Sequence, residues 1–409
     1  MKIAIYHNLT SGGSKRELYE FTKEFHRRGH TIDLYRPATA NEDYLPLNAF
    51  VRFDKVYPLE PVKRISGSLP ALRNHLNVIG TFRTLSRLDK VARRIASDID
   101  LEGYDFAFLH HDRIVQSPYV GRYLVCPTVY FCAEPMRRFY EPRIDRQFGP
   151  ARKRSARLAE WWYSPSQNAL ERAIKRLDRE NLASIDVLVT NSHYSNETIY
   201  RAYGRRASVI HLGVDTDKFV PPEPPRPDRY ILSVGAVAPL KGYDFLIRSV
   251  GLIDKPSRLP VIIVGNTASA SEVNHLTDLA GECSVDLSFR VDVSESELVA
   301  LYQGATVYAY TAIMEPMGLS PLEALACGVP VVAVSEGGVR ETMRCPGAST
   351  LTERFEAPFA RELTRVIHEL ECRVEIGHQA RQYILDYWTW PHACERMIAA
   401  LAQNGLLKD

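Results

Sequence analysis

The chain has 409 residues, which is more than one ordinary domain holds and suits two. Apolar residues make up 45% and charged residues 24%, as in globular proteins, and the net charge of +2 gives no reason to expect a nucleic-acid partner. No apolar run approaches the roughly 18 residues that cross a bilayer, and the first residues read as a strand rather than a signal peptide. Seven cysteines without a Cys-x-x-Cys pair argue against zinc motifs, so we expect a cytoplasmic protein with reduced thiols.

The first half opens with a strand, a glycine loop, a helix and a second strand. Residues 2–6 and 31–35 predict the two strands, and this unit is typical of the start of a doubly wound α/β domain. Gly12 and Gly13 let the loop backbone approach a ligand closely. The loop is not Gly-x-Gly-x-x-Gly, so we expect no dinucleotide site. Taken alone, the two glycines are more typical of an ordinary tight turn.

The alternation continues to the middle of the chain. Strands are predicted at residues 104–110, 128–132, 186–190 and 207–212, and a basic helix at residues 74–97. The strand at 128–132 runs into Ala133, Glu134 and Arg137, and strand ends of this kind face the ligand in open α/β sheets. Residues 219–229 contain five prolines and predict the domain boundary, because proline runs cannot join a sheet.

The second half repeats the pattern. Strands are predicted at residues 230–234, 261–264, 287–291, 306–310 and 330–334, and helices at 244–252, 295–302, 356–371, 374–387 and 391–402. Gly235 and Gly265 follow the first two of these strands, and Val291 ends the third. The chain therefore predicts two parallel-sheet α/β domains that face each other across a cleft.

Residues 315–338 are the most informative stretch. Glu315 follows an apolar strand, and a short helix is expected to begin with Ser320 as its N-cap and Pro321 as its first residue. Free N–H groups at a helix start suit an anionic group, and carboxylates suit sugar hydroxyls. The amides expected at the anion are those of Gly318, Leu319 and Ser320. Since Glu323 lies eight residues after Glu315, the stretch predicts a nucleotide-sugar site; a capping box is the alternative explanation of Glu323.

This stretch resembles the Glu-x7-Glu signature of family 4 retaining glycosyltransferases, and the trailing Gly337-Gly338 extends the resemblance, which covers most of the chain. It implies the GT-B fold, with an acceptor-side Rossmann-like domain at residues 1–218, a linker at 219–229, a donor-binding domain at 230–388 and a helix at 389–409 that returns to the first domain. It also implies transfer of a sugar from a nucleoside diphosphate to a hydroxyl of a glycan or lipid-linked acceptor. Retention in this family is usually explained by attack on the face from which the diphosphate leaves.

The resemblance assigns roles to individual residues. Lys241, in the loop Ser-Val-Gly-x-x-x-Pro-x-Lys-Gly, would grip the departing diphosphate, Glu315 would contact the donor sugar and Glu323 would hold the ribose; we take these three as catalytic. The other residues expected at the donor are Gly12, Gly13, Gly235, Gly265, Val291, Gly318, Leu319 and Ser320. Base contacts are expected near residues 290–292. No metal ion is expected, because the lysine and the helix dipole supply the positive charge.

Two positions depart from the family pattern. Ala236 stands where the family commonly has an arginine, and Arg340 or Lys15 would be placed to supply the missing charge. Ala133 stands where the family has a histidine associated with the donor sugar. Three explanations remain open for that position: an engineered alanine, transfer of the role to His110 or His111, or an impaired enzyme. The residues expected on the acceptor side are Lys15, His110, His111, Ala133, Glu134 and Arg137.

Residues 137–163 combine several arginines with Trp161, Trp162 and Tyr163, a composition that suits an anionic membrane surface. A salt-bridged surface helix is the alternative. We expect peripheral contact with the inner face of a membrane. Two rival functions stay open: a non-catalytic nucleotide-sugar-binding protein, motivated by Ala133 and Ala236, and a nucleotide-sugar epimerase of the same architecture.

Overall fold

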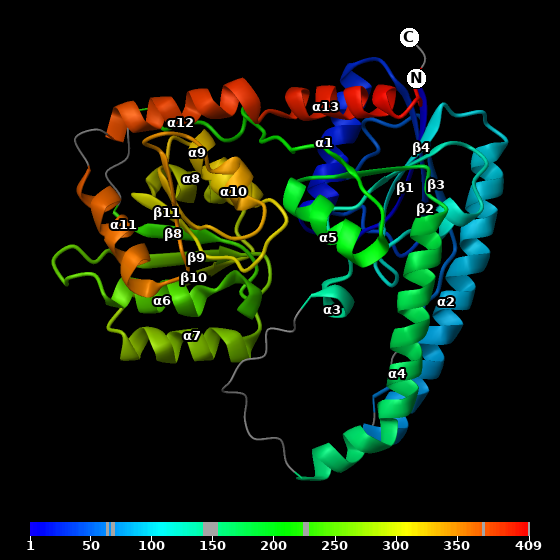
Figure 1. Cartoon of the computed structure of the whole chain (residues 1–409), viewed down its shortest axis with the longest axis horizontal. Helices are drawn as coiled ribbons and strands as arrows, with labels where there is room; N and C mark the ends of the chain where they lie inside the picture. Colours follow the sequence, from blue (N-terminus) through cyan, green and yellow to red (C-terminus); the bar gives the residue numbers. More distant parts are fainter. Residues whose placement is uncertain (63–64, 67–69, 142–153, 224–228, 370–372, 408–409) are drawn as a thin grey trace. The chain divides into compact units, whose positions relative to one another are not determined.

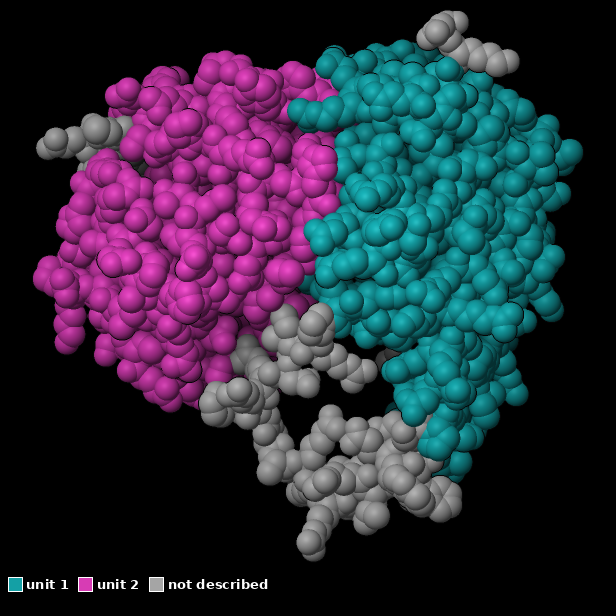
Figure 2. Space-filling view, viewed as in Figure 1, with its two compact units in different colours: residues 1–190, 196–210, 394–409 teal, residues 191–195, 211–393 magenta. Residues whose placement is uncertain are grey.

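The computed structural model describes the chain apart from residues 63–64, 67–69, 142–153, 224–228, 370–372 and 408–409 (Figure 1). The chain divides into two compact units, coloured separately in Figure 2. The first contains Met1–Thr190, Asn196–Ile210 and Cys394–Asp409, and the second contains Asn191–Ser195 and His211–Ala393. Each unit holds one parallel sheet, of seven strands and of six strands, which confirms the predicted fold class.

The first sheet has the strand order β3-β2-β1-β4-β5-β6-β7. Its strands are β1 (Lys2–Asn8), β2 (Thr31–Pro37), β3 (Asp54–Tyr57), β4 (Phe106–Asp112), β5 (Thr128–Phe131), β6 (Val187–Thr190) and β7 (Ser208–Val209). The sequence does not predict β3, an edge strand on which only Tyr57 is buried, so no apolar alternation marks it. The chain order reverses between β1 and β4, and ligands bind in such sheets at the carboxyl ends of the strands on either side of the reversal.

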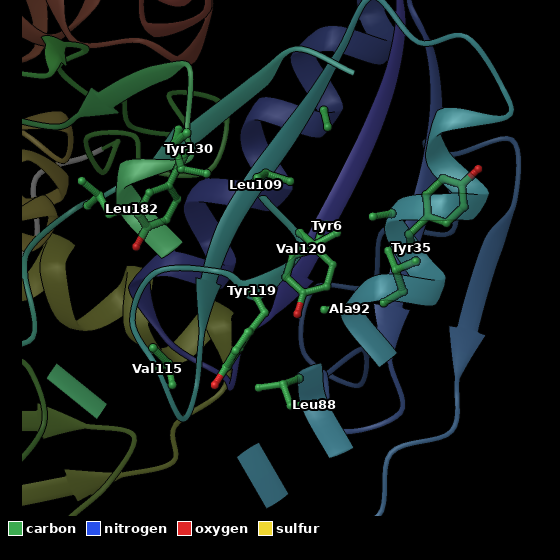
Figure 3. Packing of buried hydrophobic residues seen from close by; sticks show 14 of the residues in the cluster. Tyr6, Tyr35, Leu88, Ala92, Leu109, Val115, Tyr119, Val120, Tyr130 and Leu182 are labelled. Carbon is green, nitrogen blue, oxygen red and sulfur yellow. The ribbon is translucent and has the colours of Figure 1, made fainter. Parts of the chain in front are cut away.

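Helices cover this sheet. They are α1 (Gly13–Arg27), α2 (Pro70–Asp100), α3 (Arg137–Tyr140), α4 (Arg154–Ala183) and the part of α5 (His193–Tyr203) from Asn196 onward, since α5 begins in the other unit, with a 3-10 turn η1 (Tyr119–Arg122). One face of α2 carries Leu85, Leu88 and Ala92, which are buried at helical spacing. Figure 3 shows Ala92 beside Tyr6, and Leu88 and Tyr35 belong to the same buried cluster, so this part of α2 packs on the sheet core.

The second sheet has the order β10-β9-β8-β11-β12-β13, and its switch point lies between β8 and β11. Its strands are β8 (Ile231–Val234), β9 (Val261–Gly265), β10 (Leu287–Val291), β11 (Val307–Tyr310), β12 (Val331–Val334) and β13 (Ser349–Thr352). The helices are η2 (Pro239–Lys241), α6 (Tyr243–Gly251), α7 (Ala270–Glu282), α8 (Glu295–Gly304), α9 (Leu319–Ala326), α10 (Val339–Thr342), α11 (Glu356–His368), α12 (Arg373–Tyr387) and α13 (Trp390–Gln403).

The C-terminal helix α13 straddles the division between the units, which falls after Ala393. Within the first unit, the Nδ2 group of Asn404 donates a hydrogen bond to the Ser208 hydroxyl at 3.2 Å, and Arg28 lies 3.5 Å from Glu395. In the second unit, Arg381 of α12 donates to the carbonyls of Phe219 and Thr216. Among the described residues, no helix combines the length and apolar character that a membrane span requires.

Candidate functional site

Lys241 and Glu315 meet at the switch point of the second sheet. Lys241 ends η2, in the loop after β8, and Glu315 lies in the loop after β11. The Lys241 Nζ atom lies 2.5 Å and 2.6 Å from the two carboxylate oxygens of Glu315. The Tyr310 hydroxyl donates to the same carboxylate at 2.9 Å, and burial, followed by the charge of Glu315, raises the pKa of Tyr310 well above its usual value. The structure therefore brings two of the three predicted catalytic residues into direct contact.

The two loops are held together by their backbones. The N–H of Ile313 donates to the Leu240 carbonyl at 2.8 Å, and the Thr311 hydroxyl donates to the Lys241 carbonyl at 2.9 Å. Arg354 donates to the Thr311 carbonyl at 3.1 Å and forms a two-pronged ion pair with Glu336. Arg354 is a positioning residue that the sequence analysis missed, because no local motif surrounds it.

The helix α9 begins two residues earlier than the sequence predicts. Gly318 is the N-cap and Leu319 the first helical residue, so the assignment of Ser320 as N-cap and Pro321 as first residue is wrong. Gly318 has φ = 81°, a conformation that favours glycine, and a Cβ atom there would lie 2.7 Å from the Tyr310 hydroxyl. Pro321 is tolerated in the first turn because the N–H that it lacks would have no helical partner.

The start of α9 presents backbone N–H groups, as predicted. Those of Leu319 and Ser320 have no acceptor among the described residues. The Ser320 side chain accepts a hydrogen bond from the Tyr308 hydroxyl at 2.7 Å, so it does not cap the helix. Free amides and a helix dipole at this end suit a phosphate group.

Glu323 lies one turn further into α9 and is only 4% exposed. Its Oε2 atom accepts a hydrogen bond from the buried Tyr302 hydroxyl at 2.7 Å. Burial, together with the charge of Glu323, raises the pKa of Tyr302 well above its usual value, so the phenol stays a donor. A capping box is not formed, because Ser320 is not the N-cap and no side chain caps this helix.

Gly337 and Gly338, which follow β12, pack against the backbone of the Glu315 loop. The Gly338 N–H donates to the Glu315 carbonyl at 2.9 Å. A Cβ atom on Gly338 would lie 1.8 Å from the Pro316 carbonyl oxygen, and one on Gly337 would lie 2.3 Å from the Glu315 carbonyl oxygen. Because neither glycine has a side chain, their backbone packs directly against the backbone of Glu315 and Pro316. This contact fixes the position of the Glu315 loop.

The remaining predicted donor residues of this unit line the same edge of the sheet. Gly235 follows β8, and its N–H donates to the Val264 carbonyl at 2.8 Å. Gly265 ends β9 and lies so close to Gly235 that a Cβ atom on Gly265 would be 2.7 Å from the Gly235 carbonyl oxygen. Val291 ends β10 and is 47% exposed. These residues and Lys241 thus follow three adjacent strands, although their contact with a donor stays a prediction.

Arg340, proposed to replace the charge missing at Ala236, is exposed and donates to the Gly337 carbonyl at 3.0 Å.

In the first unit, Gly12 is the N-cap of α1 and Gly13 its first residue. Lys15 is fully buried and forms an ion pair with Glu42, which also accepts a hydrogen bond from the His7 ring at 2.9 Å. Burial lowers the pKa of Lys15. Because Glu42 already neutralises Lys15, this lysine is a poor candidate for the missing charge.

His110 is a core histidine. It is 1% exposed, its ring stacks on Phe131 with an interplanar angle of 1°, and its Nδ1 atom lies 3.7 Å from Glu17. Burial lowers the pKa of His110 well below its usual value and lowers that of His111 to about 4. Both imidazoles are therefore neutral at pH 7, and His111, which is only partly buried, is the more accessible of the two.

The loop after β5 contains the other predicted acceptor-side residues. Ala133 and Glu134 are partly buried, and the Glu134 carbonyl accepts a hydrogen bond from Gln116 at 3.0 Å. Arg137 begins α3 and pairs with Glu141 at 2.6 Å and with Glu134 at 3.5 Å. The basic and aromatic segment at 137–163 lies largely outside the described residues, since 142–153 are not described.

Several solved structures share this architecture. Anabaena Alr3699/HepE in complex with UDP and glucose is 17% identical with a TM-score of 0.69, covering 98% of this chain and 99% of that one. Sucrose-phosphate synthase from Thermosynechococcus elongatus is 17% identical with a TM-score of 0.71, covering 98% of each chain. WaaG, a glycosyltransferase involved in lipopolysaccharide biosynthesis, is 15% identical with a TM-score of 0.61 over 98% of this chain and 99% of that one. At this identity the likeness shows the fold, and that fold is GT-B.

Two family models together match nearly the whole chain. The model described as Glycosyltransferase Family 4 matches residues 11–218, and the one described as Glycosyl transferases group 1 matches residues 215–383. The chain belongs to Glycosyltransferase Family 4, which confirms the resemblance seen in the sequence.

Curated relatives carry related names. The D-inositol 3-phosphate glycosyltransferase 1 of Catenulispora acidiphila is 27% identical over 256 residues, 58% of this chain and 60% of that protein. The D-inositol 3-phosphate glycosyltransferase of Xylanimonas cellulosilytica is 33% identical over 183 residues, 40% of this chain and 44% of that protein. The matches thus span about half of the relatives' length.

Proposed function

We propose that this protein is a retaining glycosyltransferase that moves a sugar from a nucleoside-diphosphate sugar to a hydroxyl of a glycan or lipid-linked acceptor without a metal ion. The observation that carries the proposal is the contact of Lys241 with Glu315 at the switch point of the second sheet, beside the amides that open α9. A cation, a carboxylate and a helix start together suit a diphosphate joined to a sugar.

The chemistry follows from where charge develops. As the bond between the sugar C1 and the diphosphate breaks, negative charge grows on the leaving oxygens, and the acceptor hydroxyl passes its proton to them as its oxygen bonds to C1. The Lys241 ammonium has three N–H donors, so it can hold Glu315 and a phosphate oxygen together. The amides of Leu319 and Ser320 add fixed dipoles, and such preorganised electrostatics is usually the largest catalytic contribution. Glu315 binds sugar hydroxyls and Glu323 the ribose.

A donor screen followed by a transfer assay tests the proposal. UDP-, GDP- and ADP-sugars are added to the full chain, and the unfolding temperature is measured; a ligand at about 100 times its dissociation constant adds about 2.7 kcal/mol of stability. The stabilising donor is then incubated with an acceptor panel that includes an inositol phosphate, in view of the relatives' names. Transfer in the presence of EDTA, with the anomeric configuration kept, is the expected result. No stabilisation by any sugar nucleotide, or transfer with inversion, would refute the proposal.

A non-catalytic nucleotide-sugar-binding protein is the second candidate, and Ala133 and Ala236 favour it. Calorimetry distinguishes the two functions, because a binder gives a heat of binding and then no slow heat of hydrolysis or transfer. Restoring a histidine at position 133 sharpens the comparison. A gain of transfer by Ala133→His over a silent wild type would assign the second function to the natural chain.

We also propose that the first unit contacts an anionic membrane surface. Besides the basic segment at 137–163, α2 supports this proposal. Its side chains at 72, 76, 79 and 82 are apolar and between 37% and 55% exposed, and the helical spacing of three to four residues places them on one face. The exposed Arg83 and Arg87 follow directly, and residues 70–88 contain no acidic residue. Apolar side chains next to arginines suit a bilayer interface with anionic lipids.

A vesicle assay tests the membrane contact. The chain is expected to sediment with vesicles that contain anionic lipid, and to be released by salt, because screening shortens the range of charge attraction. The double variant Leu76→Glu and Phe82→Glu should stay in the supernatant. The control Leu101→Glu, at an exposed leucine directly after the last residue of α2, should behave as the wild type. Equal recovery of wild type with and without vesicles would contradict the proposal.

A further inference from the structure

A second group of polar side chains lies away from the donor loops. His193, His211 and Glu341 each offer one ligand atom, and these atoms lie within 4.8 Å of one another. His193 is the first residue of α5, His211 follows β7 and Glu341 is on α10. All three belong to the second compact unit. Neither the sequence analysis nor the proposed transfer reaction uses them.

Glu341 is held in place as an ionised carboxylate. It accepts hydrogen bonds from the backbone N–H groups of His193 and Tyr194 at 2.8 Å and 2.9 Å, and its Oε2 atom lies 2.9 Å from the Nε2 atom of His211. Burial opposes its charge, but these hydrogen bonds prevail and lower the pKa of Glu341 below its ordinary value. Each carboxylate oxygen has two lone-pair directions, so the group can accept these bonds and still bind an ion.

The two imidazoles occupy different environments. The His211 ring is partly buried and packs edge-on against Trp388, with ring centroids 5.4 Å apart. The His193 ring is exposed and lies 5.7 Å from the His211 ring. An ion pair that fastens the start of α5 explains Glu341 and His211. That ion pair does not explain why a ring nitrogen of His193 lies within 4.8 Å of the ligand atoms of both His211 and Glu341.

We propose that His193, His211 and Glu341 form a binding site for a divalent transition-metal cation of the zinc type. Two imidazoles and one carboxylate are the donors of three-ligand zinc sites, in which water fills the fourth position. Imidazole suits Zn²⁺, Ni²⁺ and Cu²⁺, whereas Mg²⁺ and Ca²⁺ prefer oxygen ligands, so the site selects against the latter two. The metal takes the place of the hydrogen bond between His211 and Glu341, and each imidazole binds it through a neutral ring nitrogen.

The position of the site gives it a structural role. Glu341 is three residues after Gly338, whose N–H donates to the Glu315 carbonyl at 2.9 Å. A bound cation would therefore tie the first turn of α5 to the loop that supports the donor-site carboxylate. This role is independent of sugar transfer, which we propose to need no metal.

Zinc binding by the full-length, tag-free chain tests the site. After treatment with a chelator and dialysis, the protein is titrated with Zn²⁺ in a calorimeter, and bound zinc is measured after gel filtration. We expect about one zinc per chain, and we expect His193→Ala to weaken binding at least about tenfold. His193→Ala is the informative variant because it leaves the backbone N–H, Glu341 and His211 in place. His378→Ala, which removes an exposed histidine of α12, is the matched control and should bind zinc as the wild type does.

Unfolding temperatures complete the test. Without metal, His193→Ala should unfold at the wild-type temperature, which shows that the variant is folded. Zinc should raise the unfolding temperature of the wild type and of His378→Ala but not of His193→Ala, and Mg²⁺ should raise none of them. If the wild type takes up no zinc, or if His193→Ala binds it as tightly as the wild type, the three residues form an ion pair only and the proposal is wrong.

Discussion

At the scale of single residues, the ammonium of Lys241 is the group on which the proposed chemistry depends most. It lies within 2.6 Å of both Glu315 oxygens. We expect Lys241→Ala to lower kcat/KM about 100- to 1,000-fold, because it removes a charge aimed at the leaving diphosphate. Lys255→Ala, at an exposed lysine in another loop, should leave kcat/KM unchanged. Near-normal turnover by Lys241→Ala would remove this residue from the mechanism.

Glu323 should respond in the same direction. Glu323→Ala removes the acceptor that we assign to the ribose, so most transfer should be lost and the dissociation constant of the donor should rise. The variant keeps Tyr302, and calorimetry with the nucleotide alone measures the change. A donor affinity equal to that of the wild type would show that Glu323 serves the core rather than the ligand.

Tyr302 gives a stability prediction that does not depend on the reaction. Its hydroxyl donates to the buried Glu323 carboxylate at 2.7 Å. Tyr302→Phe deprives that carboxylate of a donor, which costs about 1–3 kcal/mol. A fall of several degrees in the unfolding temperature is expected by calorimetric scanning. Tyr200→Phe, at a half-exposed tyrosine, is the control and should change the unfolding temperature little.

At the scale of elements, the glycine pair after β12 sets the position of the Glu315 loop. Gly338→Ala would place a methyl group 1.8 Å from the Pro316 carbonyl oxygen, so the loop must move. We expect a loss of roughly 1–3 kcal/mol in unfolding free energy and weaker donor binding. Gly281→Ala in α7 adds a methyl group with nothing within 4 Å, so it should be neutral or slightly stabilising. Equal donor affinity in both variants would show that the pair does not support the site.

The sequence predicts most elements of this fold for two reasons. Buried parallel strands read as apolar runs, and apolar residues in the helices between them recur with a period near 3.6 residues. It misses β3 and β13, where no four-residue apolar run exists. It also places the N-cap of α9 at Ser320, because serine is a preferred N-cap residue. The sequence does not show that the Ser320 hydroxyl instead accepts a hydrogen bond from the Tyr308 hydroxyl. The contact of Lys241 with Glu315 spans 74 residues, so only the assembled sheet shows it.

At the scale of the whole molecule, His7, which is buried, and His111, which is partly buried, predict how stability depends on pH. Burial lowers the pKa of His7 and of His111 to about 4, whereas an unfolded histidine titrates near 6.5. The unfolded chain therefore binds more protons between these values. Stability is complete above about pH 6.5 and falls as the pH drops towards 4, by at most about 1.4 kcal/mol per pH unit for each histidine.

Urea unfolding at pH 7.5 and pH 5.0 measures this loss, with a lower midpoint expected at pH 5.0. His7→Gln can still donate to Glu42 but does not titrate, so it should reduce the difference between the two midpoints. His378→Ala, at an exposed histidine, should preserve that difference. An unchanged midpoint between the two pH values in the wild type would contradict the assignment.

The division of the chain also restricts how the protein can be recombined with its relatives. The first unit contains Cys394–Asp409, so it is built from segments at both ends of the chain. A hybrid made with one crossover in the proline-rich segment would combine a foreign tail with the native amino-terminal lobe. Exchanging the second unit therefore takes two crossovers, the second near Ala393, with Cys394–Asp409 kept from the parent that supplies the first unit.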